Sequence, residues 1–399
     1  MKVKIIALLA VISLMAGIFA GCESSELREY SGESESSSDT SDQSVSSEEM
    51  RPDFTPAFES YDPDTVMMTI NGIDVTWREL FYWYYYEVSV LSSYVGGLPV
   101  WDETCFLDGT KTYGEYVNDT ALDTIKHYCA LESKATDTGI VLTDEDKAEL
   151  ESRWQSSVDS YGYGDEAAFK EYLEQLFLSE DMFRHINTIN VLYTRLQTEI
   201  YGEKGEKLDE AEILDEAEAQ GYMRAKHILF SVNDDAGNAL SDEEKAARRT
   251  EAEETLAELL AIEDPAALEA RFDELITEKS ADGGSAYYPD GYTFLPGKMV
   301  ESFETTVKGL EPGALSPEIV ESVYGYHIIL RLPLSTQAVT EIASDGSGYT
   351  LAQIIAEGLF TSLTTAWAEE SEVVFTKEYE EMDLAAVFNK AESVPVTQS

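Results

Sequence analysis

The chain has 399 residues, enough for about two or three domains, and its formal net charge of −51 gives a pI near 4.1. This charge argues against binding to nucleic acid, whose phosphates would repel it, and against adhesion to anionic lipid through a basic patch. It indicates a soluble, self-repelling surface.

Residues 1–21 have the features of an export signal, with a positively charged start and an apolar stretch that ends at Phe19 and is too short for a settled transmembrane helix. The segment 18–22 reads Ile-Phe-Ala-Gly-Cys and resembles a bacterial lipobox, although Phe19 departs from the usual leucine-like residue. We therefore expect Cys22 to receive a lipid that anchors the protein to the extracytoplasmic face of the bacterial cell membrane. Ordinary signal-peptidase cleavage near Ala20 is the alternative.

Residues 22–60 are rich in serine and acidic residues. Low hydrophobicity and high like charge cannot offset the entropy lost on ordering, so this segment is predicted to be a disordered tether.

Residues 61–220 are predicted to be mostly helical. A short strand with an Asn-Gly turn is expected at 65–75, and Thr-Trp-Arg-Glu at 76–79 is a capping box that starts a helix. This helix carries an aromatic run at 81–86, which we interpret as a packing surface, with a ligand cage as the alternative. Further helices are expected at 115–138, 143–161, within 165–201 (one or two helices) and at 209–220.

Two segments each place a histidine in the middle of an apolar, strand-like run: 224–230 (RAKHILF) and 324–332 (YGYHIILRL). Burying an unpaired polar group costs about 1–3 kcal/mol, so neighbouring strands that pair His227 with His327 would remove that cost. Two unrelated core histidines are the alternative. The chain has only four histidines and no CxxC, HExxH, GxSxG or P-loop pattern. These observations argue against a protein-held metal, a cofactor or a nucleophile triad.

Further motifs lie between and around these histidines. They are K-H-I-L (226–229), S-A-D-G-G-S (280–285), G-K-M-V-E-S-F-E (297–304), G-A-L-S (313–316) and G-Y-H-I-I (325–329). In this order the five motifs resemble the parvulin family of peptidyl-prolyl isomerases, over roughly 221–333. The resemblance implies a small sheet with surrounding helices that acts on X-Pro bonds without a cofactor.

The same resemblance implies the site residues. His227 and His327 would pair beneath the substrate amide, and Asp282 would lie near the twisting carbonyl; a plain turn residue is the alternative for Asp282. The pocket for the proline ring would be formed by Phe294, Met299 and Phe303, for which ordinary core packing is the alternative.

Three features depart from the family pattern. Tyr-Pro-Asp-Gly-Tyr (288–292) replaces a G-G-D-L-G stretch, Tyr324 stands where a small hydroxyl residue is common, and Val307 replaces a frequent aromatic residue. We expect these departures to affect the catalytic rate rather than the fold.

Residues 334–399 contain a predicted helix at about 350–370 and a strand-like segment at 372–376. This tail is too short to fold alone, so we expect it to return to residues 61–220, with 221–333 inserted between. The N-terminal region resembles the chaperone region of surface foldase lipoproteins through I-N-G-x-x-V-T (70–76). The predicted fold class is α+β, with a parvulin-like domain inserted in a mostly α-helical chaperone domain.

The sequence thus predicts a lipid-anchored foldase that acts on unfolded or newly exported polypeptides with X-Pro bonds. A non-catalytic chaperone with a vestigial parvulin domain is the first alternative. A solute-binding lipoprotein is the second, but it would need two similar α/β lobes, and 77–220 is predicted to be almost entirely helical. The oligomeric state stays open, with a homodimer as one option, and so does a disulfide between Cys105 and Cys129.

Overall fold

The computed structural model describes residues 50–234, 236–344 and 346–395. The expected export signal, Cys22 and the tether up to residue 49 lie outside these residues. Within the expected tether, the strand β1 (Met50–Asp53) and the helical turn α2 (Thr55–Phe58) are described. Regular structure therefore begins before residue 60, because Phe54 is buried against Phe388, with ring centroids 5.8 Å apart.

The chain forms two compact units. The first, called the helical unit below, runs to Leu196 and resumes at Thr361, and the second, called the central unit, is Gln197–Phe360. Besides β1 and α2, the helical unit contains β2 (Val66–Ile70), β3 (Ile73–Thr76), α3 (Trp77–Val95), α4 (Tyr113–Thr138), α5 (Asp144–Tyr161), α6 (Glu166–Gln175), most of α7 (Glu180–Tyr201), β10 (Val373–Phe375), α13 (Lys377–Glu380), α14 (Leu384–Phe388) and β11 (Glu392–Pro395).

Strand pairing joins the beginning and the end of the chain within the helical unit. Strand β10 pairs antiparallel with β2, which in turn pairs with β3, and β1 pairs antiparallel with β11. The side chains of Thr76, Thr112 and Thr143 accept hydrogen bonds from backbone N–H groups in the first turns of α3, α4 and α5. Each threonine thus satisfies a donor that the helix leaves without an internal partner.

The aromatic run of α3 lies inside the helical unit. Trp77, Phe81 and Tyr84 are fully buried, and Phe81 stacks on Phe388 of α14 with ring centroids 5.3 Å apart. These side chains therefore form a packing surface, as predicted, and are not available as an exposed surface for a partner.

The central unit contains the remaining elements. They are α8 (Glu210–Gln220), β4 (Met223–Ser231), α9 (Asp242–Leu260), α10 (Pro265–Lys279), a 3₁₀ turn (Gly283–Ala286), β5 (Tyr292–Phe294), α11 (Glu301–Gly309), β6 (Val320–Glu321), β7 (Gly325–Leu332), β8 (Val339–Ile342), β9 (Gly348–Thr350) and the first half of α12 (Leu351–Glu369). Helices α8 and α12 pack together through Ile213, Ala217, Leu351 and Ile355.

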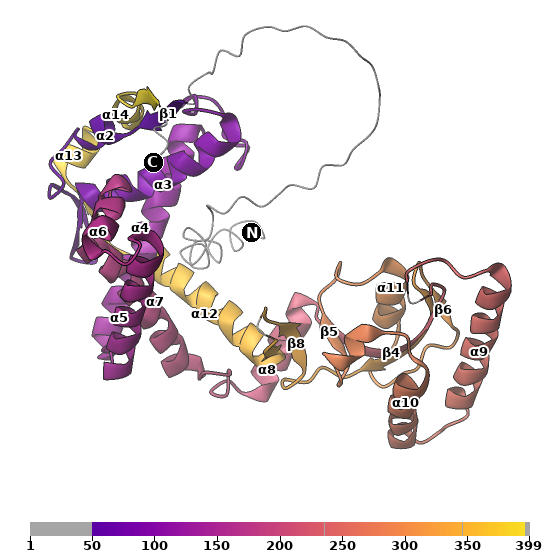
Figure 1. Ribbon diagram of the computed structural model, residues 1–399. Coiled ribbons are helices and arrows are strands. Elements are labelled where there is room, and N and C mark those ends of the chain that lie inside the picture. The colour runs from indigo at the N-terminus through magenta and orange to yellow at the C-terminus, as the bar shows by residue number, and fades with distance from the viewer. Residues whose placement is uncertain (1–49, 235, 345, 396–399) are drawn as a thin grey trace, which may run out of the picture. The chain divides into compact units, whose positions relative to one another are not determined.

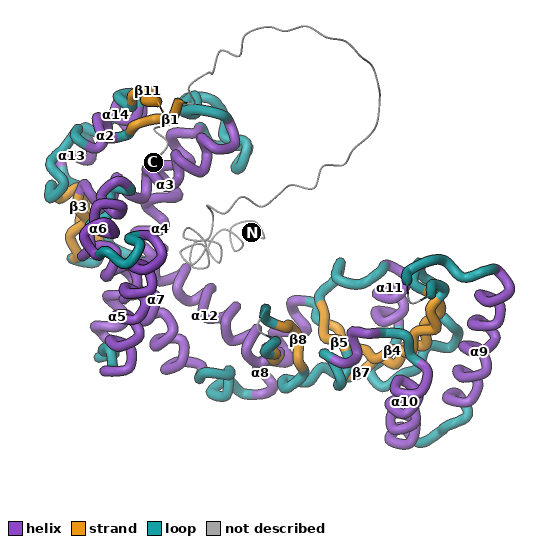
Figure 2. The backbone as a smooth tube through the Cα atoms, in the orientation of Figure 1, coloured by secondary structure: helices purple, strands orange, loops and turns teal. Residues whose placement is uncertain are grey.

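A four-stranded antiparallel sheet with the order β5-β4-β7-β6 forms the core of the central unit (Figures 1 and 2). Helices α9 and α10 pack on one face of this sheet, and α11 packs on the other. This arrangement confirms the predicted α+β class, with a small sheet and surrounding helices inserted in a chain that is otherwise mostly helical.

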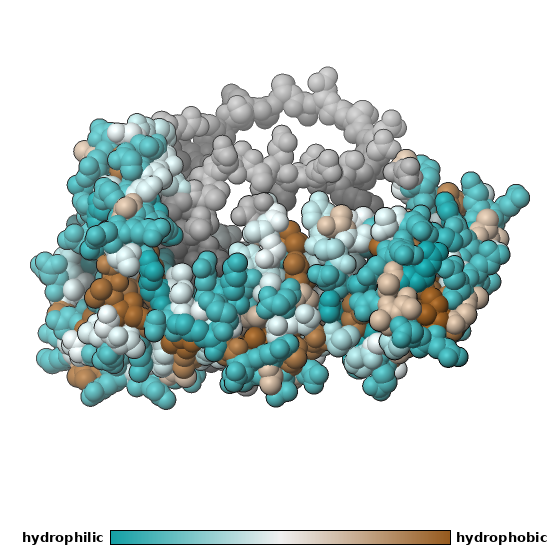
Figure 3. Space-filling view, turned by 90° about the horizontal axis from the view of Figure 1, so that it is seen from below, coloured by the Kyte–Doolittle hydropathy of each residue, from teal (hydrophilic) through white to brown (hydrophobic). Residues whose placement is uncertain are grey.

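The face of the molecule in Figure 3 is largely hydrophilic, with hydrophobic residues gathered in separate patches. A chain of this net charge needs such a surface, because moving a charged group out of water costs free energy. Among the described residues, no helix combines the length and the apolar character that crossing a membrane requires.

Candidate active site

The two predicted histidines lie on neighbouring strands and on the same face of the sheet. Strands β4 and β7 pair so that His227 is opposite Ile329 and Leu229 is opposite His327. The histidines are therefore diagonal neighbours, a separation at which side chains of this size touch. Because strand side chains alternate between faces, Met223, Ala225 and Ile329 share their face.

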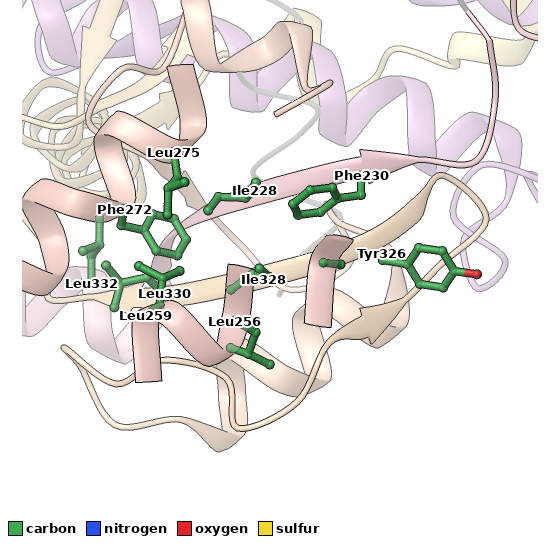
Figure 4. Packing of buried hydrophobic residues seen from close by; sticks show 11 residues of the cluster. Ile228, Phe230, Leu256, Leu259, Phe272, Leu275, Tyr326, Ile328, Leu330 and Leu332 are labelled. Atoms are coloured by element: carbon green, nitrogen blue, oxygen red, sulfur yellow. The ribbon is translucent and has the colours of Figure 1, made fainter. Parts of the chain in front are cut away.

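The opposite face of the same strands carries an apolar layer (Figure 4), beside which the buried Lys226 pairs with Glu269 and Asp273 of α10. Ile228 and Phe230 of β4 and Ile328 and Leu330 of β7 pack there against side chains of α9 and α10. The same alternation that places both histidines on one face thus supplies the core on the other.

A continuous chain of hydrogen bonds crosses the histidine face. Nδ1 of His227 lies 3.0 Å from Nδ1 of His327, and Nε2 of His227 lies 3.1 Å from Oδ2 of Asp282. At the other end, Nε2 of His327 lies 2.7 Å from Oγ of Ser322. The Tyr292 hydroxyl donates to Oδ2 of Asp282 over 2.6 Å. The structure therefore brings together all three polar residues predicted from the sequence, and it adds Ser322 and Tyr292.

The carboxylate of Asp282 sets the direction of these hydrogen bonds. A carboxylate only accepts, so His227 carries its proton on Nε2 and its Nδ1 is an acceptor. His327 must then donate from Nδ1, which leaves its Nε2 to accept from the Ser322 hydroxyl. In this arrangement each ring nitrogen has one partner. Neither imidazole is left unsatisfied by burial.

Burial and neighbouring groups shift the pKa values of Asp282, His327 and Tyr292. Partial burial opposes ionisation of Asp282, but hydrogen bonds from His227 and Tyr292 outweigh it and lower the pKa of the carboxyl to about 2. Burial, reinforced by His227, lowers the pKa of His327 to about 4. Burial and the hydrogen bond to Asp282 raise the pKa of the Tyr292 hydroxyl well above its usual value. At neutral pH the site thus holds one carboxylate, a neutral His327 and a protonated tyrosine.

The predicted proline-pocket residues line the apolar end of the same face. Phe294 and Phe303 are buried, with ring centroids 5.9 Å apart, and Met299 is partly buried against their cluster. The Phe303 ring lies edge-on to both imidazoles, at 5.3 Å from His227 and 5.9 Å from His327. The three side chains are therefore part of a packed cluster, and their role as a proline pocket stays a prediction.

A carboxylate fixes the loop that carries Met299. Glu304 of α11 accepts hydrogen bonds from the backbone N–H groups of Gly297 (3.0 Å) and Met299 (2.8 Å). These bonds lower the pKa of Glu304, the bond from Gly297 contributing most. The position of Met299 is thus set by the backbone and does not depend on the fit of its flexible side chain.

Sequence reasoning missed Tyr292 and Ser322, although both lie in or beside segments that depart from the family pattern. Tyr292 closes the 288–292 segment and approaches Asp282 because Gly284 has no side chain; a Cβ at Gly284 would collide with the tyrosine hydroxyl. Ser322 supplies a hydroxyl to His327 from five residues upstream, while Tyr324 is exposed and donates its backbone N–H to Ser322. The third departure, Val307, is fully buried beside the pocket.

The remaining cysteines lie in the helical unit as buried free thiols. Cys105 precedes α4 and Cys129 lies within it, and no disulfide joins them. Burial raises the pKa of the Cys129 thiol well above its usual value, so the thiol is unreactive at neutral pH.

Comparison with known proteins identifies the domain that carries this site. Residues 227–332 match the family described as Rotamase: PPIC-type PPIASE domain. Over 118 residues the chain is 32% identical to the Chaperone SurA of Cupriavidus metallidurans. This match covers 30% of the chain and 22% of that protein, so the chain spans about a fifth of the length of the curated relative it matches.

Solved structures of two foldases are also similar to the chain. The peptidylprolyl isomerase PrsA of Bacillus anthracis is 19% identical, with 62% of this chain and 94% of that chain covered and a TM-score of 0.23. PrsA of Bacillus subtilis is 22% identical, with 71% and 95% covered and a TM-score of 0.23. By the family match, residues 227–332 are a PPIC-type peptidyl-prolyl isomerase domain of the parvulin family.

Proposed function

We propose that this chain is an extracytoplasmic foldase, anchored to the membrane by a lipid on Cys22, whose isomerase domain catalyses cis–trans exchange of X-Pro bonds in unfolded or newly exported polypeptides. The observation that carries the proposal is an apolar cluster that contains Phe294, Met299 and Phe303 and lies directly beside a hydrogen-bonded imidazole pair, in a domain of the matching family. His227, Asp282 and His327 are the proposed catalytic residues. Phe294, Met299 and Phe303 are the proposed pocket.

The chemistry of the reaction fits this combination of groups. Rotation about a peptide bond makes and breaks no bond, yet it faces a barrier of about 18–20 kcal/mol. A catalyst must hold the proline ring, exclude water from the amide, and place polar groups where they favour the twisted amide over the planar one. The pocket holds the ring, and the fixed imidazoles beside Phe303 supply the polar surface. No cofactor is needed for any of these steps.

An assay of the intact chain tests the proposal. Exchange rates of several X-Pro peptides, measured by NMR exchange spectroscopy, should rise above the uncatalysed rate when the folded protein is present. A folded protein that leaves every rate at background would contradict catalysis. A non-catalytic chaperone with a vestigial isomerase domain would then be the better description.

The chaperone role is tested by removing the isomerase domain. A variant that joins 50–220 to 335–399 by a short linker keeps β1 and α2 of the helical unit and retains both α8 and α12, whose mutual contacts lie outside the deleted segment. It should fold and suppress aggregation of a denatured client protein. Failure to fold would contradict the inserted architecture, and folding without protection would contradict the chaperone role.

The anchor is tested at the cysteine itself. Only the Cys22 thiol can carry the diacylglycerol, so Cys22→Ala should release the protein into the medium or leave it unprocessed. Detergent-requiring membrane association that persists in this variant would contradict lipidation.

A further inference from the structure

An open groove of about 690 Å³ lies in the helical unit, away from the isomerase domain in sequence. The loop before α4, the first turns of α4, and the segment from β10 to α14 form its walls. The lining residues are Trp101, Asp102, Thr112, Gly114, Glu115, Asn118, Asp119, Phe375, Tyr379, Glu380, Met382, Asp383, Leu384 and Ala385. Its volume falls within the range of about 300–1,000 Å³ that is usual for ligand pockets.

Hydrogen bonds and ring stacking hold the aromatic walls of this groove in place. Phe375 stacks on Tyr379 with ring centroids 4.4 Å apart and planes 12° from parallel. The hydroxyls of Tyr379 and the buried Tyr84 both donate to Oδ1 of Asn118, over 3.0 and 2.7 Å. On the opposite wall, Nε1 of Trp101 donates to Asn389 over 3.0 Å. A ligand would therefore meet a surface that is already ordered, which reduces the entropy lost on binding.

The charged side chains that line the groove are all negative. Its lining includes five carboxylates and no lysine, arginine or histidine. Three of these carboxylates have internal partners: Glu115 and Asp383 cap helices, and Asp119 pairs with Lys111. Asp102 and Glu380 are exposed and form no ion pair among the described residues. These two are free to attract a cation.

Charge also excludes the competing occupants. A second copy of this chain carries the same net charge of −51, and residues 23–49 contain nine acidic residues against one arginine. Nucleic acid and anionic lipid surfaces are negative as well. The occupant that complements both the aromatic walls and the carboxylates is a positively charged segment with apolar side chains.

We propose that this groove binds short segments of unfolded polypeptides in which a lysine or arginine lies next to an aromatic or aliphatic side chain. This inference rests on the chaperone role proposed above and assigns that role a binding site and a sequence preference. The basic side chain would reach Asp102 or Glu380 and could also lie over the Trp101 or Tyr379 ring, a contact that strengthens when water is excluded. The apolar neighbour would pack on Phe375, Met382 and Leu384.

Peptide binding to the intact chain tests the inference. Fluorescence anisotropy would follow a labelled ten-residue peptide of lysine and leucine, the same peptide with every lysine replaced by glutamate, and a glycine-serine peptide. The basic peptide should bind at least about tenfold more tightly than the acidic one, and added salt should narrow the difference because it screens exposed charges. A change in tryptophan fluorescence on binding that is absent in the variant Trp101→Phe would locate the peptide in the groove.

Substitutions with matched controls separate the groove from the general charge of the protein. The double variant Asp102→Asn, Glu380→Gln should weaken binding of the basic peptide about 2–30-fold, since each of the two exposed pairs contributes about 0.2–1 kcal/mol. Asp137→Asn removes an exposed charge elsewhere on α4 and should change nothing. Phe375→Ala should weaken binding further, whereas Val374→Ala, its exposed neighbour on β10 outside the lining, should not.

Each failure has a distinct meaning. Equal binding of the basic and acidic peptides would contradict binding in the groove. So would an equal effect of the double variant Asp102→Asn, Glu380→Gln and of the control Asp137→Asn. Neither result would contradict client binding elsewhere on the chain. If no peptide binds and no denatured client is protected, the chaperone role itself is wrong and this inference falls with it.

Discussion

The two faces of the four-stranded sheet are built from alternate residues of the same strands, yet they differ in chemistry. The face under α9 and α10 is an apolar layer that includes Phe230 and Ile328, whereas the face under α11 carries His227 and His327 beside the apolar cluster of the proposed proline pocket. Strand alternation thus places the residues that stabilise the domain on one face and the residues that would act on a substrate on the other. Substitutions on one face should change stability, and those on the other should change activity.

The largest effect is expected on the apolar face. Leu259 of α9 is fully buried, so Leu259→Ala should destabilise the central unit by about 2–5 kcal/mol. Its neighbour Leu260 is 53% exposed, and Leu260→Ala should have little effect. All five tryptophans lie in the helical unit, so amide hydrogen exchange in β4 and β7 would report on the central unit and tryptophan fluorescence on the other. Similar losses for both variants would contradict the division between the two faces.

On the pocket face, the apolar wall should matter more than the charged group. Rotation of the amide needs no proton transfer, whereas the ring must be held. Losing apolar contact in a pocket costs about 10–200-fold, so Met299→Ala should lower kcat/KM by at least about tenfold. Phe303→Ala should also lower it strongly, and Met299→Leu should retain most of the rate. Asp282→Asn should cost less than either alanine variant. A larger loss in Asp282→Asn than in Met299→Ala would reverse the assignment of roles.

Much of this arrangement was predictable because its determinants are local. The apolar runs around His227 and His327 indicate the strands, and the threonine residues at 76 and 143 mark helix starts that the structure confirms. The pairing of β1 with β11 and the short helices α13 and α14 were not predicted. Segments more than 300 residues apart pair through tertiary packing, which leaves no periodic signal in either segment.

The missed site residues have a different explanation. Tyr292 and Ser322 act through single hydrogen bonds to Asp282 and His327, and only the turn geometry brings them within reach. A hydroxyl five residues before His327, across the β6–β7 turn, was the available signal for Ser322. The family pattern directed attention to the exposed Tyr324 instead. For Tyr292, the relevant feature is that Gly284 has no side chain and so leaves room for the tyrosine hydroxyl. The sequence alone does not show that these two residues meet, because only the folded loop brings them together.

A smaller effect tests whether the histidine face also supports the fold. His227→Ala removes the partner of Nδ1 of the buried His327, and an unsatisfied buried group costs about 1–3 kcal/mol. The central unit should therefore lose stability by that amount in the exchange measurement above. The double variant His227→Ala, His327→Ala should recover part of the loss, because no buried imidazole nitrogen is then left without a partner. Additive losses in the double variant would show that the two rings do not depend on each other.

The smallest effect is a pH dependence that has opposite signs in the two units. The pKa of His327 is about 4 in the folded state because of burial and of His227, against an ordinary value of 6.5. Between these values the unfolded chain binds a proton that the folded chain does not. The stability of the central unit should therefore fall as the pH drops from 6.5 towards 4, by at most about 1.4 kcal/mol per pH unit. The depressed pKa of Asp282, about 2, adds a further loss only below about pH 4.

In the helical unit the sign is reversed. Burial raises the pKa of Glu87 on α3 to about 7, so between 4.5 and 7 the folded state holds a proton that the unfolded chain releases. The contribution of Glu87 is fully present below pH 4.5 and is lost as the pH rises towards 7. Lowering the pH from 6.5 to 5 should thus weaken the hydrogen-exchange protection of β4 and β7. The same change should raise the stability of the helical unit, which is followed by tryptophan fluorescence. His327→Gln should flatten the first trend. Burial also raises the pKa of Glu79 on α3 to about 7, so the double variant Glu79→Gln, Glu87→Gln should flatten the second. If both units respond with the same sign in the parent chain, and neither variant changes its slope, burial of these groups does not control the pH response.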